Sequence, residues 1–362
     1  MDAISDTVWL PGGARAGAPP FQCTMTSSDA TALSAPRSYV EDIRPTPSKA
    51  RAPLGVVELT LADGATIKAV GVVYGLEHTI SGPGYEATLF LDQYNQRIKI
   101  LRYDATNIEG MILRIRFLAE ANGLDKIIAM ATKDDWQEFL RFGYVIEAVI
   151  KYFHRGDDAY VMSKFRSQER ISSPGLMEEI LLIERIMSSP SDVARPPLPD
   201  GYALRLARRS DIPELLALYQ SIFETYPSPL IHDSYLQTVF ESESVFAVCM
   251  HEGAIVAAAS AELHPYDRAA ELTDCATRKD ARRLGLMTHI LDLLEGELRQ
   301  RDYLCAYTMA RARSYGMNNV FYRMGYTFMG RLVNNCDIYG AYEDMNIWVR
   351  KLANGQGGAA RA

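Results

Sequence analysis

Cysteine is scarce in this chain of 362 residues, which contains five, and no two of them have the CxxC spacing of metal ligands. Cys249, Cys275 and Cys305 lie inside apolar runs that predict strands. We therefore expect buried free thiols in a reducing compartment, not a disulfide framework. The histidines are scattered without metal spacing, so no metal site is expected either.

Long apolar runs are also missing. No segment approaches the roughly 20 residues that a membrane-spanning helix needs. Residues 1–10 carry two acidic residues and no basic one, unlike a secretory signal. These absences predict a cytoplasmic protein without membrane association. The net charge of -7 argues against a nucleic-acid partner, because nucleic-acid binders present a basic face.

The chain does contain enough apolar residues, 48%, for a sizeable core, and its length suits two or three domains. Residues 1–52 are rich in Ala, Pro, Ser, Gly and Thr and predict a disordered extension. Strands and helices alternate over 53–170, and 171–200 predicts a helix followed by a Ser/Pro-rich linker. A second domain is expected over 201–352, with a disordered tail at 353–362.

Periodicity within the second domain predicts a definite order of elements. The expected series is strand Tyr202–Ala207, helix Asp211–Phe223, a hairpin through His251–Gly253, strand Glu271–Thr277, helix Leu284–Arg299, strand Tyr303–Met309, helix Met317–Met324 and a closing hairpin. The two halves of the chain also echo each other, because Phe139–Tyr144 resembles Phe321–Tyr326 and each segment leads into a strand pair. A weak internal repeat is therefore predicted.

A basic loop with a glycine, Arg282–Met287, stands between the strand that ends at Thr277 and the helix that follows it. The free N–H groups and the positive end of a helix N-terminus attract anions, above all phosphates. The first half has no counterpart of this loop, so one cofactor site per chain is expected. An ordinary solvated helix start is the alternative interpretation.

With this order of elements, residues 201–352 resemble the GNAT acetyltransferase superfamily, whose loop reads Q/R-x-x-G-x-G/A. Arg282, Gly285 and Met287 occupy the marked positions, and Met287 departs from the usual small residue, which predicts some crowding of the pocket. The resemblance implies an α/β fold with a mixed α+β sheet in the second half. It implies a truncated GNAT-like first half.

Four segments carry a closer resemblance: Glu271–Thr277, Tyr307–Asn318, Gly330–Asn335 and Glu343–Trp348. Together they are similar to the beta-lysine N-acetyltransferases, and the similarity spans about residues 85–352. It implies acetyl-CoA as co-substrate and the ε-amine of beta-lysine as acceptor, giving the compatible solute N6-acetyl-beta-lysine. It also implies a lysine 2,3-aminomutase as the pathway neighbour that supplies the substrate.

The resemblance implies which residues hold acetyl-CoA. The pantetheine arm would pair with the strand backbone as an added strand does, and the loop would cradle the pyrophosphate. The residues expected to take part are Ala276, Thr277, Arg282, Arg283, Gly285, Leu286, Met287 and Thr288.

Acetyl transfer to an amine needs a base, because an alkyl ammonium with a pKa near 10.4 must lose a proton before it attacks a thioester. Glu271 is expected to serve as the base and Asp274 as the amine anchor. Three positions apart, they face opposite sides of a regular strand, unless a bulge intervenes. Phe321 stands where many GNAT enzymes carry a Tyr that acts as the general acid. Tyr315 is another candidate for this role, and the alternative is that the CoA thiolate leaves without a proton donor.

The acceptor's carboxylate requires a cationic partner, and Arg311 and Arg313 follow a strand near the expected cleft. Asn334, Asn335 and Asn346 are expected to complete the polar pocket, although Asn-Asn is also ordinary turn chemistry. Two alternative functions stay open: an acetyltransferase of another small amine, and a non-catalytic module that binds acyl-CoA.

Overall fold

The computed structural model describes residues 4–7, 22–25, 55–71, 75–190, 196–223, 226–241, 244–338 and 340–352. The expected disordered extension over 1–52 and the tail at 353–362 lie outside these residues, except for two short strands, β1 (Ile4–Thr7) and β2 (Gln22–Met25). In the part of the chain described, no helix is long and apolar enough to cross a membrane.

The second half has the predicted order of elements with one addition, the helix Asp233–Glu241 (α7), which the sequence did not predict. Its strands and helices are β11 Tyr202–Leu206, α6 Ile212–Ile222, α7 Asp233–Glu241, β12 Ser244–His251, β13 Ala254–His264, β14 Ala269–Thr277, α8 Leu286–Gln300, β15 Cys305–Arg311, α9 Tyr315–Arg323, β16 Thr327–Ile338 and β17 Ala341–Lys351. The strands lie in the order β11-β12-β13-β14-β15-β17-β16, with only β14 and β15 parallel. The α/β mixed-sheet fold is thereby confirmed.

The first half is a smaller version of the same arrangement. It contains β3 Gly55–Thr60, β4 Thr66–Gly71, β5 Gly75–Gly82, β6 Tyr85–Asp92, β7 Arg97–Ala105, α2 Ile108–Ala121, β8 Lys126–Ala131, α3 Trp136–Arg141, β9 Val145–His154 and β10 Asp157–Phe165. The strand order β6-β7-β8-β10-β9 repeats the order β13-β14-β15-β17-β16, including one parallel pair with a crossover helix. This repetition confirms the internal repeat.

The predicted helix from residue 171 is wrong at its start. The chain forms α4 (Gln168–Ile171) and then α5 (Leu176–Met187), separated by a break. Pro174 and Gly175 explain the break, because proline disfavours helical conformation in the residue before it and glycine weakens a helix interior.

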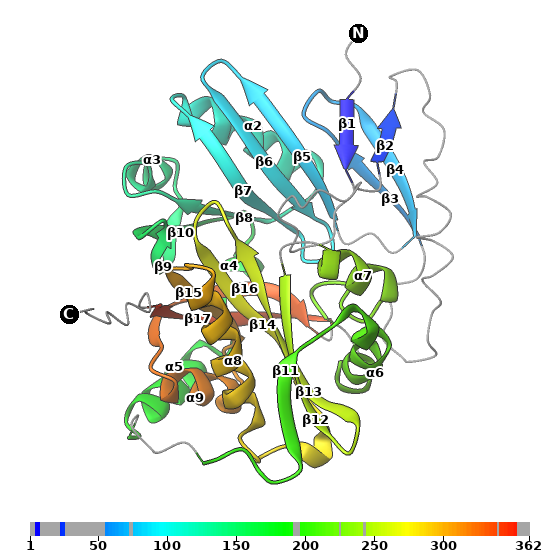
Figure 1. The fold of residues 1–362 in the computed structure, drawn as a ribbon. Helices are drawn as coiled ribbons and strands as arrows, with labels where there is room; N and C mark the ends of the chain where they lie inside the picture. The colour runs from blue at the N-terminus through cyan, green and yellow to red at the C-terminus, as the bar shows by residue number, and fades with distance from the viewer. Residues whose placement is uncertain are drawn as a thin grey trace, which may run out of the picture.

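The two halves join edge to edge through β9 and β16, which makes one 15-stranded sheet (Figure 1). At the junction Gly330 pairs with Ala148. Gly330 has φ of 137°, and a Cβ there would lie 2.3 Å from the Glu147 carbonyl oxygen. Only glycine allows the strands to approach this closely.

An apolar core also fills the space between the halves, where β9 packs against β14, β15 and β17. Phe153 of the first half contacts the ring of Tyr307 of the second, with centroids 5.7 Å apart. Ile128 and Ile150 belong to the same cluster as Ile347. The face of the first half's sheet that lies opposite α2 is therefore buried against the second half.

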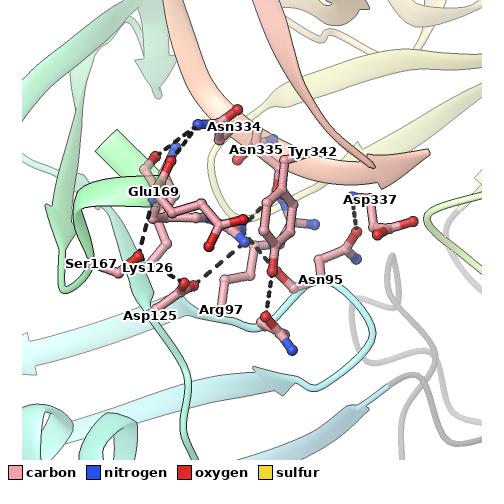
Figure 2. Close-up of polar contacts among 12 residues, drawn as sticks. Asn95, Arg97, Asp125, Lys126, Ser167, Glu169, Asn334, Asn335, Asp337 and Tyr342 are labelled. Carbon is pink, nitrogen blue, oxygen red and sulfur yellow. Dashed lines mark hydrogen bonds and ion pairs between the residues drawn. The ribbon is translucent and has the colours of Figure 1, made fainter. Parts of the chain in front are cut away.

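A buried polar cluster reinforces this junction. In Figure 2, side chains from the starts of β7 and β8 converge on the β16–β17 hairpin. The Arg97 guanidinium bonds to Asp92 at 2.8 Å and to the Asn335 carbonyl at 2.8 Å. The Lys126 ammonium pairs with Glu147 at 2.8 Å and donates to the Val333 carbonyl at 2.7 Å. Buried cations thus hold the hairpin of one half onto the strands of the other.

Candidate active site

Strands β14 and β15 diverge soon after they begin. They pair only from Ala269 and Cys305 to Glu271 and Tyr307, and both then continue without pairing to each other. Among the described residues no strand pairs with this edge of β14 beyond Glu271. The divergence leaves backbone N–H and C=O groups that an extended chain can join as an added strand does.

A β-bulge lies in β14 at this point. The pairing with β13 shifts between Ala258 and Ser260, and Asp274 has φ of 53°. The Ser260 hydroxyl donates to Asp274 at 2.6 Å, so Asp274 faces the same side as Ser260. Glu271 faces that side too, because its neighbour Leu272 packs in the core beneath α8. The strand is therefore not regular: the bulge that the sequence left open as an alternative is present, and it places the two candidate carboxyls on one face.

Glu271 lies in the middle of a row of polar groups on three adjacent strands. It is paired in register with Glu262 of β13 on one side and with Tyr307 of β15 on the other. Burial and the neighbouring Glu262 raise the pKa of Glu271 well above its ordinary value. Two carboxyls this close cannot both ionise readily, so Glu271 can hold a proton near neutral pH. In its ionised form, a carboxyl whose pKa has been raised toward the working pH suits a general base.

Tyr307 links this carboxyl to a neutral histidine. Its hydroxyl hydrogen-bonds to Glu271, and it lies 3.1 Å from Nε2 of His264. Burial lowers the pKa of His264 to about 4, so the ring is uncharged at neutral pH. Burial also raises the pKa of Tyr307, which stays protonated. Burial raises the pKa of Glu262 as well, so the groups of the row that can titrate near neutrality are the two paired carboxyls, Glu262 and Glu271.

Both halves of the chain enclose this face. From the first half, the Phe153 ring lies 5.5 Å from His264, and the His154 Nδ1 lies 2.9 Å from Asp267. From the second half, the Tyr226 hydroxyl, in the segment before α7, hydrogen-bonds to Asp274. The candidate site thus lies where the two halves meet, and the α6–α7 region packs on the same face of the sheet beside it.

The loop Arg282–Met287 leads into the N-terminus of α8 and is the predicted phosphate loop. Gly285, the N-cap of α8, has φ of 74°, and Arg283 also has positive φ, at 69°. The N–H groups at a helix start have no acceptor within the helix. Arg282 and Arg283 are exposed, and the Arg282 guanidinium donates to the Thr277 carbonyl at 3.3 Å. The loop therefore presents free N–H donors and two cations beside the end of β14.

Met287, which the sequence predicted would crowd the cofactor pocket, turns its side chain toward the core. Its side chain is buried in the core with that of Leu286, so both residues offer only their backbone N–H groups to a ligand. Ala276 is likewise buried, while Thr277 and Thr288 are half-buried. The departure from a small residue is accommodated on the core side of the helix.

The three asparagines predicted to bind substrate make hydrogen bonds to other residues of the chain. Asn346 is fully buried on the α9 side of β17, where it donates to Asn318 at 2.9 Å, opposite the face of Tyr307. Asn334 donates to three carbonyls at the end of α4, at 2.9 to 3.2 Å, which Figure 2 shows in part. The Asn335 carbonyl accepts from Arg97. The Asn334 amide and the Asn335 carbonyl thus fix the β16–β17 hairpin to the first half and α4, whereas the Asn346 amide bonds within the second half.

The other predicted substrate and acid residues separate into two groups. Arg311 lies on β15 four residues beyond Tyr307 and pairs with Glu343 at 2.6 Å, so it remains near the cleft. Arg313 instead pairs with Glu179 of α5 at 3.2 Å. Tyr315 lies 5.5 Å from the Arg185 guanidinium of α5, which places it away from the row of carboxyls.

Neither aromatic residue of α9 near the usual acid position is available. Phe321 is buried in the core, and the Tyr322 hydroxyl donates to the carbonyls of Met187 and Ser189 at 3.0 and 2.9 Å. No proton donor for the leaving group is assigned.

Several residues of the site were missed in the sequence. A signal was present in β13, whose end alternates small apolar residues with Ser260, Glu262 and His264, the pattern of a strand with one polar face. Tyr307 can be recognised as the neighbour of Glu271 only when the register between the parallel strands β14 and β15 is known.

A cavity of about 560 Å³ lies elsewhere, between α5 and the edge formed by β9 and β16. Its lining is mostly apolar, and it includes Val145, Ile180 and Phe328. Phe328 packs on Trp348, on the α9 side of the sheet, so this cavity does not open onto the carboxyl row. Among the described residues no cluster of His, Cys, Asp or Glu could hold a metal ion.

Comparison with known proteins agrees with this geometry. Residues 212–326 match the model of the acetyltransferase (GNAT) family. The chain is 32% identical over 274 residues to the N-acetyltransferase YodP of Bacillus subtilis, covering 76% of this chain and 99% of that protein. It is 33% identical to the beta-lysine N(6)-acetyltransferase of Methanosarcina mazei, covering 66% of this chain and 95% of that protein. The corresponding enzyme of Methanococcus maripaludis is 29% identical, with 73% and 96% covered.

Proposed function

The chain belongs to the GNAT acetyltransferases, in the group that includes the beta-lysine N(6)-acetyltransferases, and on that premise we propose that it transfers acetyl from acetyl-CoA to the N6 amine of beta-lysine. The observation that carries the proposal is the Glu271 carboxyl, with its raised pKa, at the point where β14 and β15 diverge. Beta-lysine is lysine with one amine moved from C2 to C3, so a lysine 2,3-aminomutase would supply it.

The residues present fit the binding of acetyl-CoA. The N–H groups from Gly285 to Met287, with Arg282 and Arg283, would hold the phosphates at the α8 N-terminus, since the Thr288 N–H already donates to the Gly285 carbonyl at 3.1 Å. The open edge of β14 at Ala276 and Thr277 would hold the pantetheine arm. Acetyl-CoA supplies an activated acetyl group as a thioester.

In the proposed reaction Glu271 takes a proton from the N6 ammonium. The amine nitrogen forms a bond to the acetyl carbon, and the bond from that carbon to sulfur breaks. The second ammonium proton goes to the sulfur, so one CoA thiol and one proton are released per amide formed. Glu262 and Asp274, which face the same space, would hold the ammonium group in place.

Gly285 is expected to be necessary for binding acetyl-CoA. A side chain at φ of 74° costs about 1–2 kcal/mol, and relaxation would turn the loop N–H groups away. A loss of this size in binding free energy corresponds to an affinity about tenfold weaker. Isothermal titration calorimetry should show this weaker acetyl-CoA binding for Gly285→Val. The matched control is Gly296→Ala within α8, where the helix favours alanine and no atom lies within 4 Å. Equal affinity of Gly285→Val and the wild type would refute this role.

Removal of the charge of Glu262 should shift the pH dependence. Glu262 raises the pKa of Glu271, and the base acts only as carboxylate, above that pKa. Glu262→Gln should therefore move the acid limb of the kcat/KM profile to lower pH, by about one pH unit for a neighbouring like charge. Profiles of both proteins with the same acceptor measure it. A limb that stays in place, or moves to higher pH, would contradict the carboxyl pair.

The proposed function is tested by an acceptor panel. CoA release is measured with beta-lysine, alpha-lysine and a polyamine at equal concentrations. Beta-lysine should have the highest kcat/KM. Equal or better turnover of alpha-lysine or the polyamine would indicate an acetyltransferase of another amine. Tight acetyl-CoA binding without turnover of any acceptor would indicate a non-catalytic module.

A further inference from the structure

The first half presents a cation to the carboxyl row of the second half. Side chains alternate along β7, so Lys99 lies on the same face as Arg97. The Arg97 guanidinium reaches the Asn335 carbonyl of β16 at 2.8 Å, which shows that this face is directed at the second half. Lys99 interacts electrostatically with Glu262, Glu271 and His264. It is thus the first half's charged contribution to the candidate site.

Lys99 differs from the other cations at the junction. Arg97 and Lys126 are buried and paired with Asp92 and Glu147, both at 2.8 Å. Lys99 is half-buried, and among the described residues it forms no ion pair or hydrogen bond. A half-buried ammonium that faces a cleft without a direct partner is ready to bind an anion.

The charged groups of the candidate site match an acceptor that is an amino acid with a second amine at the end of its side chain. Glu262, Glu271 and Asp274 suit an ammonium group, and Lys99 suits a carboxylate on the same molecule. Arg311, the residue first expected in this role, is already paired with Glu343. Resting on the proposed function, we propose that Lys99 binds the carboxylate of the acceptor and so makes the enzyme select an amino acid over the corresponding diamine.

The proposal assigns substrate selection to the half that has no phosphate loop. Lys99 comes from β7 of the first half, whereas Glu271 comes from β14 of the second. The acceptor would lie between them, with its carboxylate toward β7 and its reacting amine toward the diverging strands. Lys99 is a binding residue here, and proton transfer does not involve it.

The test compares beta-lysine with pentane-1,4-diamine, which is beta-lysine without its carboxylate. The ratio of kcat/KM for these two acceptors is measured in the wild type, Lys99→Met, Lys99→Arg and Lys151→Met, an exposed control on β9. Loss of a charge-assisted bond should lower the ratio about 10- to 100-fold in Lys99→Met. The rates are compared above the acid limb of the pH profile, because Lys99 lowers the pKa of Glu271 and its loss moves that limb to higher pH for both acceptors. On this plateau the change should be a rise in KM for beta-lysine, with the diamine unaffected. Lys99→Arg should retain most of the preference, and Lys151→Met all of it.

The outcomes that overturn the proposal are distinct. If Lys99→Met keeps the wild-type ratio, Lys99 does not bind the carboxylate of the acceptor. Equal losses for both acceptors, with the acid limb of the pH profile displaced, would make Lys99 a regulator of Glu271 instead. These results leave the proposed function standing, because the wild type still acetylates beta-lysine. A wild type that does not turn over beta-lysine would overturn both.

Discussion

Glu271→Gln is expected to lower kcat by about 10²- to 10⁴-fold, the contribution typical of a general base. The amide cannot accept the ammonium proton, yet it keeps the shape of the side chain and can still hydrogen-bond to Tyr307, the partner of Glu271. Acetyl-CoA affinity should not change, since the phosphate loop begins beyond the end of β14. Steady-state CoA release gives kcat, and calorimetry gives the affinity.

The control for this change is Glu138→Gln, on the surface of α3 in the first half, where Glu138 pairs only with Arg141. It should leave kcat unchanged. A Glu271→Gln enzyme within a few-fold of the wild-type rate would show that another group removes the proton. Asp274, on the same face, would then be the residue to replace next.

Lys126→Met is expected to lower the free energy of unfolding by about 3–5 kcal/mol, the cost of leaving one partner of a buried ion pair uncompensated. Lys126 is fully buried, and burial lowers its pKa to about 8 even though it lies 2.8 Å from Glu147. Its loss would leave the Glu147 carboxylate with only the Val333 N–H and Ser163 hydroxyl. Urea unfolding monitored by circular dichroism measures the change.

A second substitution separates charge from packing. Lys126→Met combined with Glu147→Gln removes both charges, and the amide can still bond to Val333, so most of the lost stability should return. Lys133→Met, which breaks the exposed pair with Asp157, is the surface control and should have little effect. Equal stability of Lys126→Met and the wild type would mean that this cluster does not hold the halves together.

Much of the fold could be predicted because the elements have strong periodicity. The helix series of the second half follows the apolar spacing of the sequence, and the Phe139–Tyr144 repeat corresponds to a repeated strand order. The α7 helix was missed, since it follows a proline-rich segment and has low hydrophobicity. Strand β5 was also missed, because its residues around His78 mix apolar and polar types.

The site could be predicted in part, and the limit was the pairing of distant strands. Glu271 and the phosphate loop follow from local motifs. The role of Asn346 could not be predicted, because the face of β17 on which it lies depends on the register between β17 and β15. Lys99 could not be found from its own surroundings, since its relation to Glu271 exists only once the two halves join at β9 and β16.

The central claim is acetyl transfer to one nitrogen of beta-lysine, and the product tests it most directly. The wild-type protein is incubated with acetyl-CoA and beta-lysine, released thiol is counted, and NMR locates the acetyl group. The account predicts one amide per thiol released, with the acetyl group on N6. Acetylation of the amine at C3, or release of thiol without any amide, would contradict it.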